Sequence, residues 1–310
     1  MELAFDRVAV ADEVGERTGP RWTLPTALAG AAGLAALAPV LRRRLVPLVG
    51  PTAADAATAA SLAVAGWMGL AVLERVAPHD PAWNRDDGEL RTDLLFAFAL
   101  APPTTLGASF VRRALTGGRG RRTVLADLPI PVQVALGAVA LEGVHYAHHR
   151  ASHQVPALWR FHAVHHSVRR LYWVNSGRFH PVDLVPLLTA QMVVLSTLGL
   201  DPDAVVALQV FKGIHGQLQH ANIATAPSVL DQVFSTPEQH RWHHGPDASA
   251  NLNYGAVLAV FDRVLGTQRR GTPPPLGAGS ATDRPARLRD LLARPFRSRP
   301  TSPGPSVGAG

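Results

Sequence analysis

Long apolar runs separated by short polar segments dominate the first two thirds of the chain. Three of these runs contain no charged residue over 18 positions or more, and they cover residues 22–41, 56–73 and 94–111. A helix needs about 20 apolar residues to cross a hydrocarbon core of ~30 Å. We therefore expect three membrane-crossing helices here, with a kink or break in the third at Pro102 and Pro103.

A fourth apolar run, at residues 128–141, is shorter than the first three. Its 14 residues fall below the ~17 that a membrane span usually requires. Arginines lie both before it, as at Arg113, and after it, as at Arg150. Because basic loops tend to stay on the cytoplasmic side, both ends of this run are expected on that side. The pattern predicts a re-entrant or interfacial helix.

Two further apolar runs, residues 184–200 and 204–214, are separated by the turn Asp201-Pro202-Asp203. Aspartate and proline at such a boundary favour a turn between two helices. We expect a helical hairpin at 184–214 that enters the membrane and returns. The residues before it and after it then meet at the same face of the protein.

The hydropathy pattern as a whole predicts an all-α integral-membrane bundle of about four transmembrane helices plus the re-entrant or interfacial helix. Arg42, Arg43 and Arg44 follow the first run directly and mark a cytoplasmic end by the positive-inside rule. We expect a multi-pass protein with a helical, histidine-rich cap on its cytoplasmic face. The chain then divides into a polar tail, N-terminal membrane helices, a histidine-rich region and a disordered basic tail, at residues 1–21, 22–141, 142–267 and 268–310.

Composition agrees with a membrane protein and removes several other classes. Charged residues make up 17% of the chain, below the quarter that is usual in soluble proteins. Much of the net charge of +7 comes from eight arginines beyond residue 267, where Phe296 is the single aromatic residue. This tail suits solvent or a lipid surface better than nucleic acid. The absence of cysteine excludes disulfides, thiolate zinc sites and iron–sulfur clusters.

Histidine is concentrated in one part of the chain. Thirteen of the 14 histidines lie between positions 145 and 244, and eight of them have helical spacing of three or four residues. These eight are His149 and His153, then His162, His165 and His166, and finally His240, His243 and His244. Eight imidazoles are too many for one ion, so we expect two metal ions with open coordination positions. Imidazole suits iron, zinc, copper and nickel alike.

Further polar residues near these histidines are candidates for the same site. His145 precedes His149 by one helical turn, and His215 and His220 lie at the end of the predicted hairpin. Glu142 and Asp183 are carboxylates of the kind that orient metal-bound imidazoles. His180 lies close to Asp183 in the sequence, and Asn222 lies close to His220. We place His220 among the expected ligands. The others are candidates for ligands or for groups that hold ligands in place: His145, His180, His215, Asn222, Glu142 and Asp183.

These motifs together resemble the fatty acid hydroxylase / sterol desaturase superfamily. The resemblance rests on HRASH, LWRFHAVHHS, RFHPVD, QHANI, TPEQHRWHH, NYG and FDRVLGT, which follow one another between residues 142 and 267. It implies a membrane bundle with a cytosolic histidine-rich cap, two iron ions, O₂ as co-substrate, and hydroxylation or desaturation of a lipid C–H bond. It also implies that the eight spaced histidines and His220 are metal ligands. Glu142 in place of the usual Asp and Phe261 in place of the common Trp are its departures.

Electrons for such a reaction must come from another protein. The chain contains no GxGxxG fingerprint and no haem motif, so an external ferredoxin or cytochrome with its reductase is implied. A zinc hydrolase is disfavoured because HExxH is missing. The main alternative is a membrane metal-binding or metal-transport protein without oxygenase activity, although the predicted spans hold almost no charge to line an ion path. The sequence leaves open which lipid is the substrate and whether it is hydroxylated or desaturated.

Overall fold

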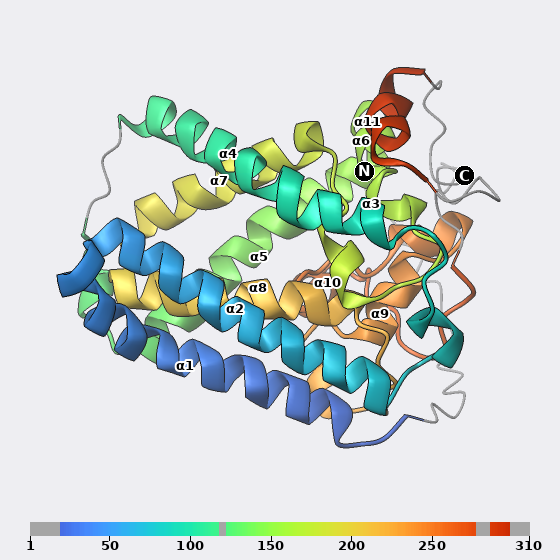
Figure 1. The fold of residues 1–310 in the computed structure, drawn as a ribbon, viewed down its shortest axis with the longest axis horizontal. Coiled ribbons are helices and arrows are strands. Elements are labelled where there is room, and N and C mark those ends of the chain that lie inside the picture. The colour runs from blue at the N-terminus through green and yellow to red at the C-terminus, as the bar shows by residue number, and fades with distance from the viewer. Residues whose placement is uncertain (1–18, 118–121, 277–285, 298–310) are drawn as a thin grey trace, which may run out of the picture.

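The computed structural model describes residues 19–117, 122–276 and 286–297, and within these residues it contains helices and no β-strand. Five helices are long and apolar enough to cross a membrane: Thr23–Val49, Pro51–Val76, Leu90–Thr116, Ile130–Gln154 and Pro181–Leu198. The long helices lie side by side, and short helices gather at one end of them (Figure 1). The prediction of an all-α protein with several membrane helices is confirmed.

The first two long helices, α1 (Thr23–Val49) and α2 (Pro51–Val76), form a hairpin. Gly50 joins them with a φ of +80°, a conformation that glycine adopts without a steric penalty. Helix α8 (Pro202–His220) packs against both. Gly66 of α2 makes this contact close, because a Cβ atom there would lie 2.5 Å from Ile214 of α8.

The third predicted span is continuous, with an irregular winding before its prolines. Helix α3 (Leu90–Leu94) passes into a π-helical turn (Leu95–Leu100), which α4 (Ala101–Thr116) continues. Pro102 and Pro103 have no N–H to donate, and they occupy the first turn of α4, where a missing donor is best tolerated. The wider π turn therefore takes the place of the predicted break.

The fourth apolar run belongs to a longer helix than the sequence suggested. Helix α5 (Ile130–Gln154) continues without interruption through the first histidines. At its start, Gln133 accepts a hydrogen bond from the N–H of Asp201, and near its end Ser152 contacts Asp183. Helix α5 thus runs the whole length of α7 (Pro181–Leu198). The helix is longer than the 14-residue apolar run, because polar histidines end the run but do not end the helix.

Helices α7 and α8 form the predicted helical hairpin. The side chain of Asp201 caps α8 by accepting a hydrogen bond from the N–H of Asp203. The carboxylate of Asp203 in turn pairs with Arg42 and Arg43 at 2.9 and 2.6 Å. These two arginines therefore lie at the α7–α8 turn, at the opposite end of the bundle from the histidines on α5 and α8. The expectation that they mark the same face as the histidines is wrong.

The short helices cover the end of the bundle that carries the histidines. They are α6 (Pro156–His162), α9 (Pro237–His243), α10 (Val260–Val264) and α11 (Leu288–Arg297). Helix α11 lies in the tail that was expected to be disordered, and its Leu291 is buried against Phe96 and Val164. That part of the expectation is wrong, because an apolar stripe in the arginine-rich sequence packs onto the bundle. Residues 277–285 and 298–310 of the tail, and residues 1–18, lie outside the described residues.

Candidate metal centre

Nine histidines from four segments meet at the end of the bundle where α5 finishes and α7 begins. We call this the histidine end. Helix α5 contributes its last turns, and the end of α8 contributes His220. Helix α9 begins with a capping box between Thr236 and Gln239 and with Pro237 in its first turn, which fixes where its histidines lie. The nine residues form two groups, one of five and one of four.

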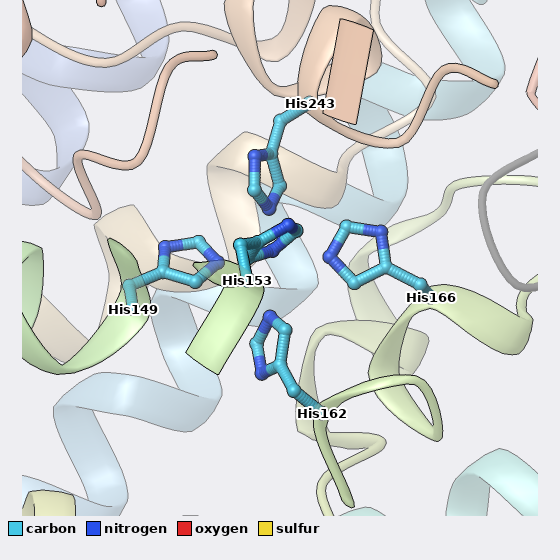
Figure 2. Close-up of side chains that lie close together, drawn as sticks. All are labelled: His149, His153, His162, His166 and His243. Carbon is cyan, nitrogen blue, oxygen red and sulfur yellow. The ribbon is translucent and has the colours of Figure 1, made fainter. Parts of the chain in front are cut away.

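The first histidine group consists of His149, His153, His162, His166 and His243. One ring nitrogen from each of them lies within 4.8 Å of the corresponding nitrogens of the others, and all five residues are buried. The five rings surround a common centre, which they approach from different elements (Figure 2). This is the arrangement that several imidazoles adopt around one metal ion.

The second histidine group consists of His165, His220, His240 and His244, again with ring nitrogens within 4.8 Å of one another. The Nε2 atoms of His165 and His220 are 3.3 Å apart, and those of His240 and His244 are 3.1 Å apart. The two groups adjoin, since the stacked rings of His166 and His244 have centroids 4.4 Å apart. Two metal positions would therefore be neighbours.

Two sets of three histidines with helical spacing are each divided between the two groups: His162, His165 and His166, and His240, His243 and His244. His162 ends α6, and His165 and His166 follow in a separate 3₁₀ turn (His165–Ser167). His162 and His166 belong to the first group and His165 to the second. The expectation that all three share one helical stripe is therefore wrong, because the break after His162 turns His165 the other way. In α9, His243 likewise belongs to the first group and His240 to the second.

The unpaired nitrogens of these rings fit metal ions. A buried polar atom without a hydrogen bond costs about 1–3 kcal/mol, so folded proteins seldom leave several together. In the first group, Nε2 of His149, His162 and His243 has no partner, and neither nitrogen of His153 or His166 has one. One nitrogen of each of the five rings belongs to the shared cluster of ligand atoms. A bound metal would give these five nitrogens a partner at once.

Hydrogen bonds to the other ring nitrogen fix the orientation of several rings. The Nδ1–H of His149 donates to the carbonyl of Tyr254 at 2.7 Å, and that of His243 donates to the carbonyl of Leu252 at 2.8 Å. Asn175 accepts from Nδ1 of His220 at 2.9 Å. In this tautomer Nε2 keeps its lone pair for a metal. These three acceptors had no signature in the sequence, since two of them are backbone carbonyls.

The electrostatics of the site favour neutral imidazoles. Burial lowers the pKa of His243 to about 3. Burial, and then the charge of neighbouring imidazoles, lowers the pKa of four more histidines well below the usual value: His165, His166, His240 and His244. A cluster of imidazolium ions in this space would be strongly unfavourable. The lowered pKa values favour the uncharged form of these five rings, in which a nitrogen lone pair is available to a metal.

Asp183 is the candidate carboxylate that contacts a grouped histidine directly. Its Oδ2 accepts a hydrogen bond from Nδ1 of His162 at 2.8 Å, and its Oδ1 accepts from Nε2 of His148 at 2.9 Å. Ser152 adds a longer contact at 3.4 Å. Asp183 is therefore placed to hold the ring of His162 with its Nε2 turned toward the first group.

Glu142 and His145, on the same helix, lie outside both groups. The carboxylate of Glu142 accepts hydrogen bonds from the N–H groups of Ala256, Val257 and Leu258 at 2.7–3.1 Å. It thus anchors the loop whose Tyr254 carbonyl holds His149, and it does not touch a grouped histidine itself. The ring of His145 lies 5.2 Å from that of His149, with its Nδ1 unpaired.

His180, His215 and Asn222 also lie outside both groups. His180 caps α7, because its Nδ1 accepts from the N–H of Val182. His215 makes a 3.2 Å hydrogen bond with the carbonyl of Ala256. Asn222 binds the backbone of Asp80 on both sides and so fastens the loop after α2. Each of the three has a partner outside the two histidine groups, and a role in the site stays a prediction for them.

A cavity of about 210 Å³ leads from between α7 and α8 to both histidine groups. Apolar side chains of α7, such as Leu184 and Leu187, form one wall, and the wall formed by α8 includes Gly213 and Gly216. A Cβ atom on either glycine would meet nothing within 4 Å, so these positions widen the cavity. At the histidine end it is lined by His149, His162, His165, His220 and His240.

Lys212 of α8 also lines the cavity, and the hydropathy pattern gives it little weight because it interrupts an apolar run only once. Its Nζ donates a hydrogen bond to Oε1 of Gln191 on α7 at 3.1 Å. Both residues line the cavity. The signal that distinguishes Lys212 is its uniqueness, since the other 29 of the 30 basic residues are arginines.

Comparison with known proteins agrees with this geometry. Residues 134–267 match the family model described as fatty acid hydroxylase. The chain is 35% identical over 208 residues to the ornithine lipid hydroxylase OlsE of Rhizobium tropici, covering 64% of this chain and 63% of that relative. It is 27% identical over 138 residues to an alkylglycerol monooxygenase of Caenorhabditis elegans, covering 43% of this chain and 27% of that relative.

A third relative is the fatty acid hydroxylase vlmA of Lecanicillium sp, with 29% identity over 155 residues, or 44% of this chain and 42% of that protein. The aligned stretches thus span less than two thirds of each of these three relatives. No solved structure matches the chain. The matched region contains all nine grouped histidines, the α7–α8 hairpin and the cavity.

Proposed function

Because this chain belongs, through residues 134–267, to the fatty acid hydroxylase / sterol desaturase superfamily, we propose that it is a membrane-bound oxidoreductase acting on lipids. In this proposal the nine grouped histidines hold two iron ions, and O₂ is the co-substrate for hydroxylation or desaturation of a lipid C–H bond. The observation that carries the proposal is the pair of adjacent, buried histidine groups with unpaired ring nitrogens.

The two groups would hold one iron each. His149, His153, His162, His166 and His243 would bind the first, and His165, His220, His240 and His244 the second. Iron bound there would supply the activation of O₂ that an inert C–H bond requires. The chain's own task is to fix the ligands. Asp183 and the carbonyls of Leu252 and Tyr254 do so by holding Nδ1 of the rings that they contact.

The cavity would place the lipid. Its walls are largely apolar, and it ends against rings of both groups, so a chain that fills it presents a C–H bond to the metals. Burial of the grouped histidines keeps bulk water from this point. Exclusion of water protects a reactive site from side reactions.

Electrons and protons come from outside the chain. Hydroxylation inserts one atom of O₂ into the C–H bond and reduces the other to water, which takes two electrons and two protons. We propose an external ferredoxin or cytochrome with its reductase as the donor. The histidine end would face the cytoplasm, where such donors occur, and arginines on this end such as Arg150 and Arg160 would attract an acidic partner.

The alternative of a metal-binding or transport protein finds less support. A transport path would need polar or charged groups along the length of the bundle. Here the histidine groups are confined to one end of it, and the cavity that reaches them has largely apolar walls. A catalytic centre fed with an apolar substrate accounts for both features.

Alanine variants of one histidine from each group test the proposal. We expect His243→Ala and His165→Ala to insert normally, to lose bound iron and to lose O₂-dependent lipid product, as measured by metal analysis and lipid profiling of expressing cells. His79→Ala is the matched control, since His79 lies outside both groups. Full product formation by either variant would remove the assignment of the histidines as iron ligands.

A further inference from the structure

The cavity contains a cation that the proposed chemistry does not use. Lys212 lies in the middle of α8, and Gln191, its hydrogen-bond partner, lies in the middle of α7. A charged side chain at this depth of an apolar bundle is unfavourable unless a partner compensates it, and such residues usually mark a functional site. Since every other basic residue of the chain is arginine, a lysine here is unusual.

No carboxylate of the described residues forms an ion pair with Lys212. Glu142 attracts it electrostatically, but both oxygens of Glu142 are occupied by the backbone N–H groups of residues 256–258. The bond to Gln191 uses one of the three protons of the ammonium group. Lys212 therefore retains donors for a further acceptor in the cavity.

Gln191 offers a second free donor beside the first. Its side chain is only 5% exposed, and its Nε2 is buried without a hydrogen-bond partner. Because its Oε1 accepts from Lys212, the amide N–H groups point away from the lysine and remain available. An ammonium and an amide donor side by side in the cavity, one from α8 and one from α7, match the two oxygens of a carboxylate or the oxygens of a phosphate.

The two helices also set the distance between these donors and the histidines. Lys212 precedes His220 by eight residues on α8, which is a rise of about 12 Å. On α7, Gln191 follows Asp183 by eight residues, again about 12 Å. Helices α7 and α8 thus place the two donors at the same distance along the bundle from the histidine end. A lipid whose oxyanion is held there would present a carbon further along its chain to the histidine end.

We propose that Lys212 and Gln191 bind an oxyanion of the lipid substrate, a carboxylate or a phosphate, and so select acidic lipids and fix which carbon is oxidised. This inference rests on the proposed function for the oxidation step, but binding of the oxyanion does not require it. Lys212 is in this account a substrate-positioning residue. Neutral lipids such as sterols and alkylglycerols lack the group that it recognises.

Binding to the purified full-length protein tests the inference without turnover. Palmitate and methyl palmitate serve as probes, because they differ in whether the carboxylate is free. We expect the protein to bind palmitate roughly tenfold to hundredfold more tightly than the ester. Lys212→Met should remove this preference, and Lys212→Arg, which keeps the charge, should retain most of it. Equal binding of acid and ester by the unaltered protein, or an unchanged preference in Lys212→Met, would overturn the proposal.

Competition with lysophosphatidic acid distinguishes the two oxyanions. Displacement of palmitate supports a site that accepts phosphate, and resistance to displacement supports a site restricted to carboxylates. The iron content of each variant serves as the check on folding, since Lys212 lies outside both histidine groups.

Product analysis separates this inference from the proposed function. With iron bound, Lys212→Met should raise KM for the acid with little change in kcat and should spread oxidation over several carbons. Equal oxidation of acid and ester would overturn the inference and leave the oxygenase standing. Binding of acid that depends on Lys212, without oxidation of any lipid, would support the inference and contradict the oxygenase.

Discussion

Nδ1 of His162 lies 2.8 Å from Oδ2 of Asp183, and this contact connects the start of α7 to the first histidine group. The carboxylate forces the proton of His162 onto Nδ1, which leaves Nε2 free at the centre of the group. His148 shares the same carboxylate from the other side. One aspartate thus couples the position of α7, which lines the cavity, to the position of a proposed iron ligand.

Asp183→Asn should weaken this arrangement without removing a ligand. An amide in place of the carboxylate cannot accept both imidazole protons with the same strength. We expect metal affinity or turnover to fall roughly tenfold to hundredfold, as measured by iron titration and product formation. Ser152→Ala removes only the longer 3.4 Å contact to the same carboxylate and should stay close to the unaltered protein. Normal iron binding and rate in Asp183→Asn would show that the contact does not orient His162.

Glu142→Gln should destabilise the histidine end. The carboxylate accepts three backbone hydrogen bonds from residues 256–258, and a neutral amide loses charge-assisted bonds of this kind. We expect the free energy of unfolding to fall by about 2 kcal/mol, seen as a lower melting temperature in mild detergent. Asp290→Asn, at an exposed carboxylate of α11, is the matched control and should change nothing measurable. Equal melting temperatures for Glu142→Gln and the unaltered protein would show that Glu142 does not anchor the loop at residues 256–258.

Gly216→Leu should close the cavity and leave the fold intact. A side chain at this position enters open space beside the histidines, and leucine favours a helix over glycine by up to about 1 kcal/mol. Turnover should fall by roughly two orders of magnitude because the substrate is displaced, while iron content and melting temperature are preserved. Gly33→Leu, at a glycine of α1 that also faces open space, should retain activity. Similar activities in the two variants would mean that the substrate does not use this cavity.

The chain has no cysteine, so single cysteines report the orientation of the bundle without background. Arg263→Cys lies at the histidine end, next to the loop that Glu142 anchors, and Thr52→Cys lies at the opposite end, at the start of α2. Both positions are exposed. In intact cells, a membrane-impermeant thiol reagent should label Thr52→Cys and spare Arg263→Cys. The reverse pattern would place the histidine end outside the cytoplasm.

The sequence predicted the histidine site better than it predicted the surrounding elements. The spacing of His149 with His153, and of His240 with His243, shows which residues meet because it follows helical geometry. The separation of His165 from His162 does not follow that rule, since α6 ends between them. Apolar runs located every long helix, but the extent of α5 depends on packing against α7 that no local pattern reveals.

The groups that hold the ligands were harder to find than the ligands. Asp183 carries a side chain that can be recognised, whereas the carbonyls of Leu252 and Tyr254 are supplied by backbone that any residue has. Lys212 was hidden for a different reason. A single lysine hardly changes the hydropathy of an apolar run, and its importance lies in facing Gln191 across a cavity that forms only when α7 and α8 pack together.

The most direct test of the account is the metal content of the full chain, purified anaerobically in mild detergent from cells supplied with iron and characterised by Mössbauer spectroscopy. Two adjacent histidine groups predict two irons per chain with the spectrum of a spin-coupled pair. A single iron per chain, or full lipid oxidation by protein that holds none, would contradict it.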